Sequence, residues 1–465
     1  MKVLKMKSQN KKILIHFIGI GGIGMSGIAE IMNDLGYKVQ GSDIGTNDTI
    51  HRLKEKGIKI FKGHNSKNVL NISAAVYSSA IDKKNAEILS CKKNSIPVVS
   101  RADMLAELMK NKKSIAIAGS HGKTTTTSII GSILDNADLD PTIINGGIIN
   151  SYSKNNKLGK GEWIVAEADE SDGSFLKLPH QISIITNLDI EHLDFYKNKK
   201  NLIRTFENFI LNLPFYGYSI ICTDNSNLKK IVKKIKTRNI VSYSIKDKDA
   251  NVFISNIKND INSKIFKIKI NKKINNYYGD YLFKVNLLGD HNILNCTASI
   301  IASFILGIKI NKIRKGILNF KGVKRRFTEI GKKNNALIID DYAHHPTEIK
   351  ATLSAAKKIS KNIIVIFQPH RYSRTNFLMK DFINILSKIE NLYILKTYSA
   401  GEKIIKNATS KKLFINLRKE NKNVKYVINE KKLFEMLQKQ TNKNCLIIFM
   451  GAGSITKDAY NFMKY

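Results

Sequence analysis

Residues 114–128 read SIAIAGSHGKTTTTS and decide the class of fold. The run Ser114–Ala118 predicts a buried strand, a turn containing glycine, serine and histidine follows, and the threonines predict the start of a helix. Gly122-Lys123-Thr124 is typical of a phosphate-binding loop, in which backbone amides, a lysine and a hydroxyl contact phosphates and Mg²⁺. The glycine that a full Walker A motif places five residues earlier is Ile117 here. A strand, phosphate loop and helix predict a nucleotide-binding α/β domain, with Lys123 in a solvated loop.

Acidic residues follow the next two apolar runs. Glu167–Asp172 (EADESD) comes after Trp163–Ala166, and Asn187–Asp194 (NLDIEHLD) comes after Ile182–Thr186. The carboxyl ends of parallel strands meet at one edge of a sheet, where ligands collect. Carboxylate oxygens at that edge suit Mg²⁺, and His192 is a candidate second metal ligand. Beside a phosphate loop, these stretches predict a site for phosphate chemistry.

A second glycine turn lies near the N-terminus. Gly19–Gly24 (GIGGIG) follows the apolar run Ile13–Ile18 and precedes Met25–Leu35, which has helical periodicity. Asp43 ends the next expected strand, close to the spacing of a ribose-binding carboxylate. Amides at such a helix start stabilise a pyrophosphate. The pattern indicates a diphosphate-linked nucleotide, and it leaves NAD and a UDP-sugar both open.

The chain divides into three series of alternating strands and helices. We expect domains at residues 1–111, 112–324 and 325–465, each with a mostly parallel sheet. Residues 247–280 are polar and weakly alternating, which predicts an antiparallel flank with little chemistry. Strands of the third series are expected at Ala336–Asp341, Ile363–Phe367, Tyr393–Leu395 and Leu446–Met450.

Composition excludes several classes of protein. The 465 residues are 43% hydrophobic, so general disorder is excluded. The net charge of +39 comes from lysines spread along the whole chain, without an RNA- or DNA-binding motif, so we expect no specific nucleic-acid partner. Four scattered cysteines fit a reduced cytoplasmic protein, and no apolar stretch is long enough to span a membrane.

Read in order, these residues resemble the Mur ligases, ATP-dependent amide-forming enzymes of peptidoglycan precursor synthesis. Eight motifs carry the resemblance over nearly the whole chain: HFIGIGGIGMSGIAE (16–30), AGSHGKTTTT (118–127), EADESD (167–172), NLDIEHLD (187–194), GDHNILNCTASI (289–300), GVKRRF (322–327), DDYAHHPTEI (340–349) and FQPHRYSRT (367–375). The family uses the shorter GxxGK[ST] loop, which accounts for Ile117.

The resemblance implies three domains: an N-terminal Rossmann-like domain for a UDP-sugar, a central P-loop ATPase-like domain, and a C-terminal Rossmann-like domain for an amino acid. It implies ATP and Mg²⁺ as cofactors, with Lys123, Glu167 and His192 catalytic and Thr124, Glu167 and His192 on Mg²⁺. The implied ATP-binding residues are Gly119, Ser120, His121, Gly122, Lys123, Thr124, Thr125, Asn292, Asn295, Arg326 and Asp341. The implied UDP-sugar residues are Gly19, Gly21, Gly22, Gly24 and Asp43, and the implied amino-acid residues are Tyr342, His344, His370, Arg371 and Arg374.

The implied reaction phosphorylates the lactyl carboxylate of UDP-N-acetylmuramate with ATP, and the amine of L-alanine attacks the acyl phosphate. An alternative is a sibling ligase that joins a preformed peptide to the same nucleotide sugar and shares almost every motif. A nicotinamide dehydrogenase would explain the first glycine turn but not the phosphate loop or the acidic motifs. A nucleic-acid-binding protein would explain only the charge.

Overall fold

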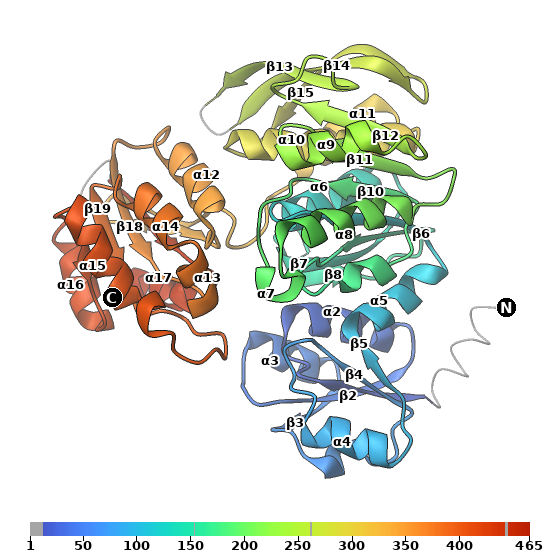
Figure 1. Ribbon diagram of the computed structural model, residues 1–465, viewed down its shortest axis with the longest axis horizontal. Coiled ribbons are helices and arrows are strands. Elements are labelled where there is room, and N and C mark those ends of the chain that lie inside the picture. Colours follow the sequence, from blue (N-terminus) through green and yellow to red (C-terminus); the bar gives the residue numbers. More distant parts are fainter. Residues whose placement is uncertain (1–12, 153, 261–262, 442–444) are drawn as a thin grey trace. The chain divides into compact units, whose positions relative to one another are not determined.

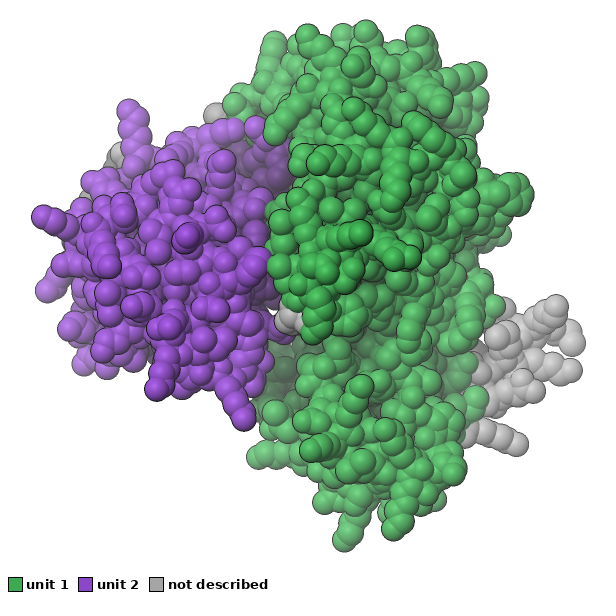
Figure 2. Space-filling view, in the orientation of Figure 1, with its two compact units in different colours: residues 1–287, 292–321 green, residues 288–291, 322–465 purple. Residues whose placement is uncertain are grey.

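The computed structural model describes residues 13–152, 154–260, 263–441 and 445–465. It contains three sheets (Figure 1). The chain forms two compact units, one of residues 1–287 and 292–321 and the other of residues 288–291 and 322–465 (Figure 2). The first unit carries two of the sheets and the second unit carries the third.

The first sheet has five parallel strands in the order β3-β2-β1-β4-β5. Its strands are β1 (Leu14–Ile18), β2 (Lys38–Asp43), β3 (Lys59–Lys62), β4 (Ala74–Tyr77) and β5 (Val98–Ser100). Its helices are α2 (Ile23–Asp34), α3 (Asp48–Glu55), α4 (Ala86–Lys93) and α5 (Arg101–Lys110), with the 3-10 turn η1 (Ser66–Val69). The strand–glycine turn–helix predicted at the N-terminus is confirmed as β1, residues 19–22 and α2. All five carboxyl ends therefore meet at the edge that carries the glycine turn.

The central sheet has ten strands, and its middle is parallel. The order is β15-β14-β13-β12-β11-β10-β6-β9-β7-β8. The strands are β6 (Lys113–Ala118), β7 (Thr142–Ile149), β8 (Lys154–Lys157), β9 (Trp163–Glu167), β10 (Ile182–Ile185), β11 (Tyr218–Cys222), β12 (Asn239–Ser244), β13 (Val252–Asn259), β14 (Lys264–Ile274) and β15 (Tyr277–Val285). The helices are α6 (Lys123–Asn136), α7 (Leu193–Tyr196), α8 (Lys199–Leu211), α9 (Ser226–Lys234), α10 (Asp290–Ile305) and α11 (Ile310–Asn319), with the 3-10 turn η2 (Ser174–Lys177).

The antiparallel flank predicted at residues 247–280 is confirmed in its type. Strands β13, β14 and β15 pair antiparallel with one another at the far end of the central sheet (Figure 1). In β14, Phe266, Ile268 and Ile270 are buried, while the lysines between them are more exposed. This alternation is typical of a half-buried sheet. The flank extends the hydrophobic core and contributes no residue to the predicted site.

The third sheet has six strands in the order β16-β17-β21-β18-β19-β20, and only β16 is antiparallel to its neighbour. The strands are β16 (Thr328–Lys333), β17 (Ala336–Asp341), β18 (Asn362–Phe367), β19 (Asn391–Ile394), β20 (Lys425–Tyr426) and β21 (Cys445–Met450). The helices are α12 (Pro346–Ala356), α13 (Tyr372–Phe377), α14 (Met379–Leu386), α15 (Ser410–Glu420), α16 (Glu430–Gln438) and α17 (Ile455–Lys464), with the 3-10 turn η3 (Lys406–Ala408). The four strands predicted in this region are confirmed to within a few residues.

The hydrophobic cores are divided between the two compact units. One large cluster joins apolar side chains of the first sheet to those of the central sheet, and two others lie wholly within residues 336–462. All four cysteines (Cys91, Cys222, Cys296 and Cys445) are buried as thiols, in agreement with the absence of a predicted disulfide framework. Among the described residues, every helix is too short or too polar to cross a membrane.

Candidate active site

The first glycine turn is held by strand β2. The amides of Gly19 and Ile20 donate to the carbonyl of Ser42 at 2.8 and 3.0 Å. Asp43 accepts from the amide of Gly21 at 2.9 Å, so the predicted ribose carboxylate also fixes the turn. A Cβ at Gly21 would lie 2.9 Å from the same oxygen, which explains the glycine at this position. Gly22 then caps α2, and the first amides of this helix face the edge where all five strands end.

The phosphate loop requires glycine at two positions. Gly119 and Gly122 have φ of +130° and +86°, a region that side chains disfavour. A Cβ at Gly119 would lie 2.2 Å from the Thr186 hydroxyl oxygen, and one at Gly122 would lie 2.5 Å from an oxygen of Asn295. The loop is therefore enclosed on both sides. Helix α6 begins at Lys123, so the amides of its first turn are free to meet an anion.

The end of β10 clamps the phosphate loop. The His121 amide donates to Asn187 Oδ1 at 2.8 Å, and Asn187 Nδ2 donates back to the His121 carbonyl at 3.0 Å. The Asp189 amide donates to the Ser120 hydroxyl at 2.9 Å. From the sequence, this stretch was predicted only to bind a metal ion at the edge of the sheet. Its role in shaping the loop comes from the pairing of β10 with β6, which the motifs alone do not specify.

Lys123 forms an ion pair that the sequence analysis did not identify. Its Nζ lies 2.8 Å from both carboxylate oxygens of Glu170 and 2.5 Å from the Gly119 carbonyl. The side chains are only 16% and 3% exposed, so Lys123 is not in a solvated loop, contrary to expectation. Burial acts to lower the pKa of Lys123, but the carboxylates of Glu170 and Asp169 outweigh it and raise the pKa. The ammonium is therefore charged at neutral pH.

Glu167 and Thr124 lie at the same sheet edge. Glu167 ends β9, which pairs with β6, and Thr124 is in the first turn of the helix that follows β6. The carboxylate of Glu167 accepts from the amide of Gly146 on β7 at 2.8 Å. A Cβ at Gly146 would lie 2.6 Å from the other oxygen, so this glycine makes room for the carboxylate. A carboxylate and a hydroxyl in this position fit the oxygen preference of Mg²⁺.

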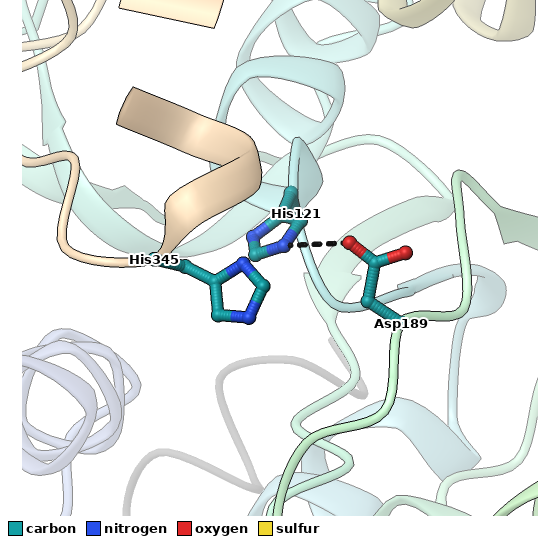
Figure 3. Close-up of side chains that lie close together, drawn as sticks. All are labelled: His121, Asp189 and His345. Carbon is teal, nitrogen blue, oxygen red and sulfur yellow. Dashed lines mark ion pairs between the residues drawn. The ribbon is translucent and has the colours of Figure 1, made fainter. Parts of the chain in front are cut away.

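A second polar group surrounds His192. His192 has φ of +57°, and its Nε2 lies 3.6 Å from a carboxylate oxygen of Glu191. His121 Nε2 lies 3.2 Å from Asp189 Oδ2 (Figure 3). The same nitrogen lies 3.7 Å from Glu191 Oε1. The predicted residues His121 and His192 are thus brought close to two carboxylates of the NLDIEHLD motif. These carboxylates are oxygen donors of the kind that a divalent cation requires.

Asn292 and Asn295 share one face of α10, as their spacing predicts. Asn295 Nδ2 donates to Asn292 Oδ1 at 3.3 Å. Asn295 is 5% exposed and lies against Gly122 of the phosphate loop. The two amides are therefore placed beside the loop, within the same compact unit.

In the second unit, Asp341 organises the start of the domain. It ends β17 and accepts from the amides of Phe327 and Ala343 at 2.7 and 2.9 Å. Burial raises the pKa of this carboxyl group despite these hydrogen bonds and the nearby Arg326. Arg326 and the previously unassigned Arg325 lie over the Tyr342 ring, 5.1 and 4.7 Å from its centre. The predicted Arg326, Asp341 and Tyr342 therefore form one cluster.

The remaining predicted residues follow two neighbouring parts of the third sheet, His344 after β17 and the other three after β18. The rings of His344 and His370 lie 5.7 Å apart, and Arg374 Nη1 lies 3.1 Å from His370 Nδ1. Burial lowers the pKa of His370 to about 3, and His344 and the arginines add to this effect, so His370 is neutral. Arg371 instead faces Glu402, with Nε 4.0 Å from the carboxylate, and this acid was not a predicted site residue. The two arginines therefore have different partners within the protein, Glu402 for Arg371 and His370 for Arg374.

Profiles of the Mur ligase family match almost the whole chain. The profile described as the Mur ligase family catalytic domain matches residues 14–113, the Mur ligase middle domain matches 117–303, and the Mur ligase glutamate ligase domain matches 325–453. With its parallel sheets, phosphate loop and three successive domains, the chain belongs to the Mur ligase family.

Relatives within the family point to one member. The UDP-N-acetylmuramate–L-alanine ligase of Rickettsia rickettsii (strain Sheila Smith) is 47% identical over 99% of this chain and 96% of its own length. That of Rickettsia bellii is 45% identical over 99% of this chain and 98% of its own. The solved UDP-N-acetylmuramate–alanine ligase of Thermotoga maritima matches with a TM-score of 0.83 and 27% identity, covering 97% of this chain and 98% of its own. A murein peptide ligase from Psychrobacter arcticus shares the fold, with a TM-score of 0.74, 22% identity and coverage of 97% and 98%.

Proposed function

We propose that the protein joins L-alanine to the lactyl carboxylate of UDP-N-acetylmuramate, with ATP converted to ADP and phosphate, in peptidoglycan precursor synthesis. The observation that carries this proposal is the 47% identity, over 99% of the chain, to ligases of that name. The phosphate loop with its charged lysine supports it, because a carboxylate needs activation before an amine can attack it.

The three domains divide the substrates. Residues 1–111 bind the UDP-sugar through Gly19, Gly21, Gly22, Gly24 and Asp43. Residues 112–324 bind ATP, and residues 325–465 bind the amino acid. The free amides at the start of α2 and α6 support the first two assignments, because helix N-termini attract phosphate groups.

ATP is bound by the phosphate loop, Gly119 to Thr125, and by adenine contacts from Asn292 and Asn295. Arg326 and Asp341 contribute to nucleotide binding from the C-terminal domain. Lys123 stabilises the negative charge that develops on the transferred phosphoryl group, since a preorganised cation acts most strongly where charge forms. Its raised pKa supports this role because the ammonium keeps its proton.

Thr124, Glu167 and His192 hold Mg²⁺, the first two at one position and His192 at a second. The oxygen donors at the ends of β9 and β10 fit the cation, as described above. Bound Mg²⁺ neutralises phosphate charge and orients the phosphates. The protein's own part is to fix the donors, and Gly146 does this for Glu167 by hydrogen bonding.

The amino acid is bound by Tyr342, His344, His370, Arg371 and Arg374. In the bond-forming step the lactyl carboxylate takes the terminal phosphoryl group from ATP as an acyl phosphate. The alanine nitrogen attacks the carbonyl carbon, and phosphate leaves. Arg374 donates to Nδ1 of the neutral His370, so Nε2 of His370 carries the proton and supports donation of a hydrogen bond to the amino-acid carboxylate in this pocket.

An ADP-release assay with each substrate omitted in turn tests the function. We expect ADP release to require both UDP-N-acetylmuramate and L-alanine. A preformed peptide that replaces L-alanine with higher kcat/KM would identify the sibling ligase instead. ADP release independent of the nucleotide sugar would contradict both activities.

A further inference from the structure

Arg101 lies at the first glycine turn, although no sequence motif singles it out. It begins α5 directly after β5, whose carboxyl end is at the same sheet edge as the turn. A Cβ at Gly24 would lie 3.1 Å from Arg101 Nη1 and 3.6 Å from Cζ. The guanidinium of Arg101 therefore lies against the first turn of α2 at Gly24.

The same guanidinium reaches the central domain. Arg101 Nη2 lies 2.9 Å from Asp169 Oδ2, and the two side chains are 21% and 43% exposed. Asp169 belongs to the EADESD stretch and directly precedes Glu170, the partner of Lys123. All four residues lie in the first compact unit.

Adjacent carboxylates hold the two cations. Asp169 pairs with Arg101 beside the glycine turn, and Glu170, the next residue along the chain, pairs with Lys123 of the phosphate loop. The acidic stretch after β9 therefore contacts one cation at each of the two glycine-rich turns.

We infer that Arg101 is a further binding residue for the diphosphate of the nucleotide sugar, and that Asp169 competes with the diphosphate for its guanidinium. This inference rests on the proposed function. The planar fork of arginine suits phosphate oxygens, and partial exposure leaves it accessible to a ligand at the start of α2.

Titration calorimetry with the full chain tests the direct contact, using UDP and uridine as probes. Arg101→Ala should weaken UDP binding about 10- to 100-fold, as expected for a lost charged hydrogen bond, and leave uridine binding unchanged. Arg101→Lys should fall between the two, because it keeps the charge and loses the fork. Lys110→Ala is the matched control, since it removes an exposed cation from the other end of the same helix.

Asp169→Asn tests the competition. It should tighten UDP binding severalfold, because the guanidinium no longer has a charged competitor. If Arg101 only braces the two domains, Arg101→Ala and Asp169→Asn would both lower the melting temperature and leave UDP binding unchanged, and the inference would be overturned. A wild-type chain that binds no UDP-N-acetylmuramate would instead overturn the proposed function.

Discussion

Lys123, through its ion pair with Glu170, contributes to the stability of the fold as well as to the proposed catalysis. Lys123→Ala should lower kcat roughly 10²–10³-fold, since it removes a preorganised charge. It should also destabilise the fold by up to about 3 kcal/mol, because it leaves the carboxylate of Glu170 buried without its partner. Steady-state kinetics and urea unfolding measure the two effects.

A double variant separates these effects. Lys123→Ala with Glu170→Gln removes the stranded charge, so it should recover most of the lost stability and none of the lost kcat. Recovery of activity in the double variant would show that Lys123 acts only by neutralising Glu170.

Glu87, on helix α4, is the centre of a buried polar network beside the first sheet. Its carboxylate accepts from the Ser42 hydroxyl and from Asn68 Nδ2, both at 2.6 Å. Burial acts to raise the pKa of Glu87, but hydrogen bonds with His16, Ser42 and Asn68 outweigh it and lower the pKa to about 2. Because the folded pKa is depressed, the stabilisation is present above the unfolded pKa and is lost as the pH falls toward 2.

Glu87→Gln should therefore cost about 1.5–3 kcal/mol of unfolding free energy at neutral pH. The difference from wild type should shrink below about pH 4.5, the ordinary pKa of the group. Urea unfolding between pH 7 and 3.5 measures this, with the exposed Glu162→Gln as a control that changes little. A difference that stays constant with pH would contradict the assignment.

For individual residues, the sequence predicts contacts between side chains that are close together in the chain. The i, i+3 pair Asn292 and Asn295 lies on one helix face as expected. Glu170, Glu402 and Arg101 were not predicted as partners, because their contacts join segments far apart in the chain and depend on tertiary packing. The expectation for Lys123 failed for the same reason, since its burial is produced by a separate strand end.

At the scale of secondary-structure elements, β7 is the strand in which a small substitution should disturb the proposed metal site. Gly146→Ala would place a Cβ 2.6 Å from Glu167 Oε2 and so displace this carboxylate. We expect kcat to fall at least about tenfold, because small misplacements of a positioned group are costly. The Mg²⁺ concentration for half-maximal activity should rise as well.

A magnesium titration of the rate provides the measurement, with Glu167→Gln for comparison. That variant should shift the magnesium requirement in the same direction and further. If circular dichroism shows that Gly146→Ala is folded and its magnesium requirement is unchanged, the assignment of Glu167 as a magnesium ligand is contradicted.

Strands were predictable because buried parallel strands are short apolar runs. The run Ala336–Asp341 matches β17, and Ile182–Thr186 differs from β10 by one residue. The short hairpin strand β8 (Lys154–Lys157) was not predicted, since its sequence KNNK carries no apolar pattern. Its two asparagines are buried, and Asn155 Nδ2 donates to the Ile23 carbonyl of α2 at 2.7 Å.

At the scale of the whole molecule, the hydrophobic cores indicate which segments of the chain can fold on their own. Two core clusters lie wholly within residues 336–462. A fragment of residues 322–465 should therefore unfold cooperatively in urea, as an independent domain does. A fragment with no cooperative transition would show that this core needs the rest of the chain.

The first sheet differs from the third in this respect. Met104, Leu105 and Met109 belong to a cluster that also contains Phe175 and Leu178, beyond the expected boundary at residue 111. The sequence identifies the change of domain by the restart of the strand–helix pattern, but it does not reveal how far one core continues into the next. Binding studies of the UDP-sugar site therefore require the full chain.

The four buried thiols give each sheet region an internal marker. Cys91 lies beside the first sheet, Cys222 and Cys296 in the central domain, and Cys445 in the third sheet. Burial raises the pKa of Cys222 to about 12 and also raises that of Cys91, so these thiols are inert toward alkylating reagents while the fold is closed. The order in which they react on gradual denaturation records which region opens first, without any introduced label.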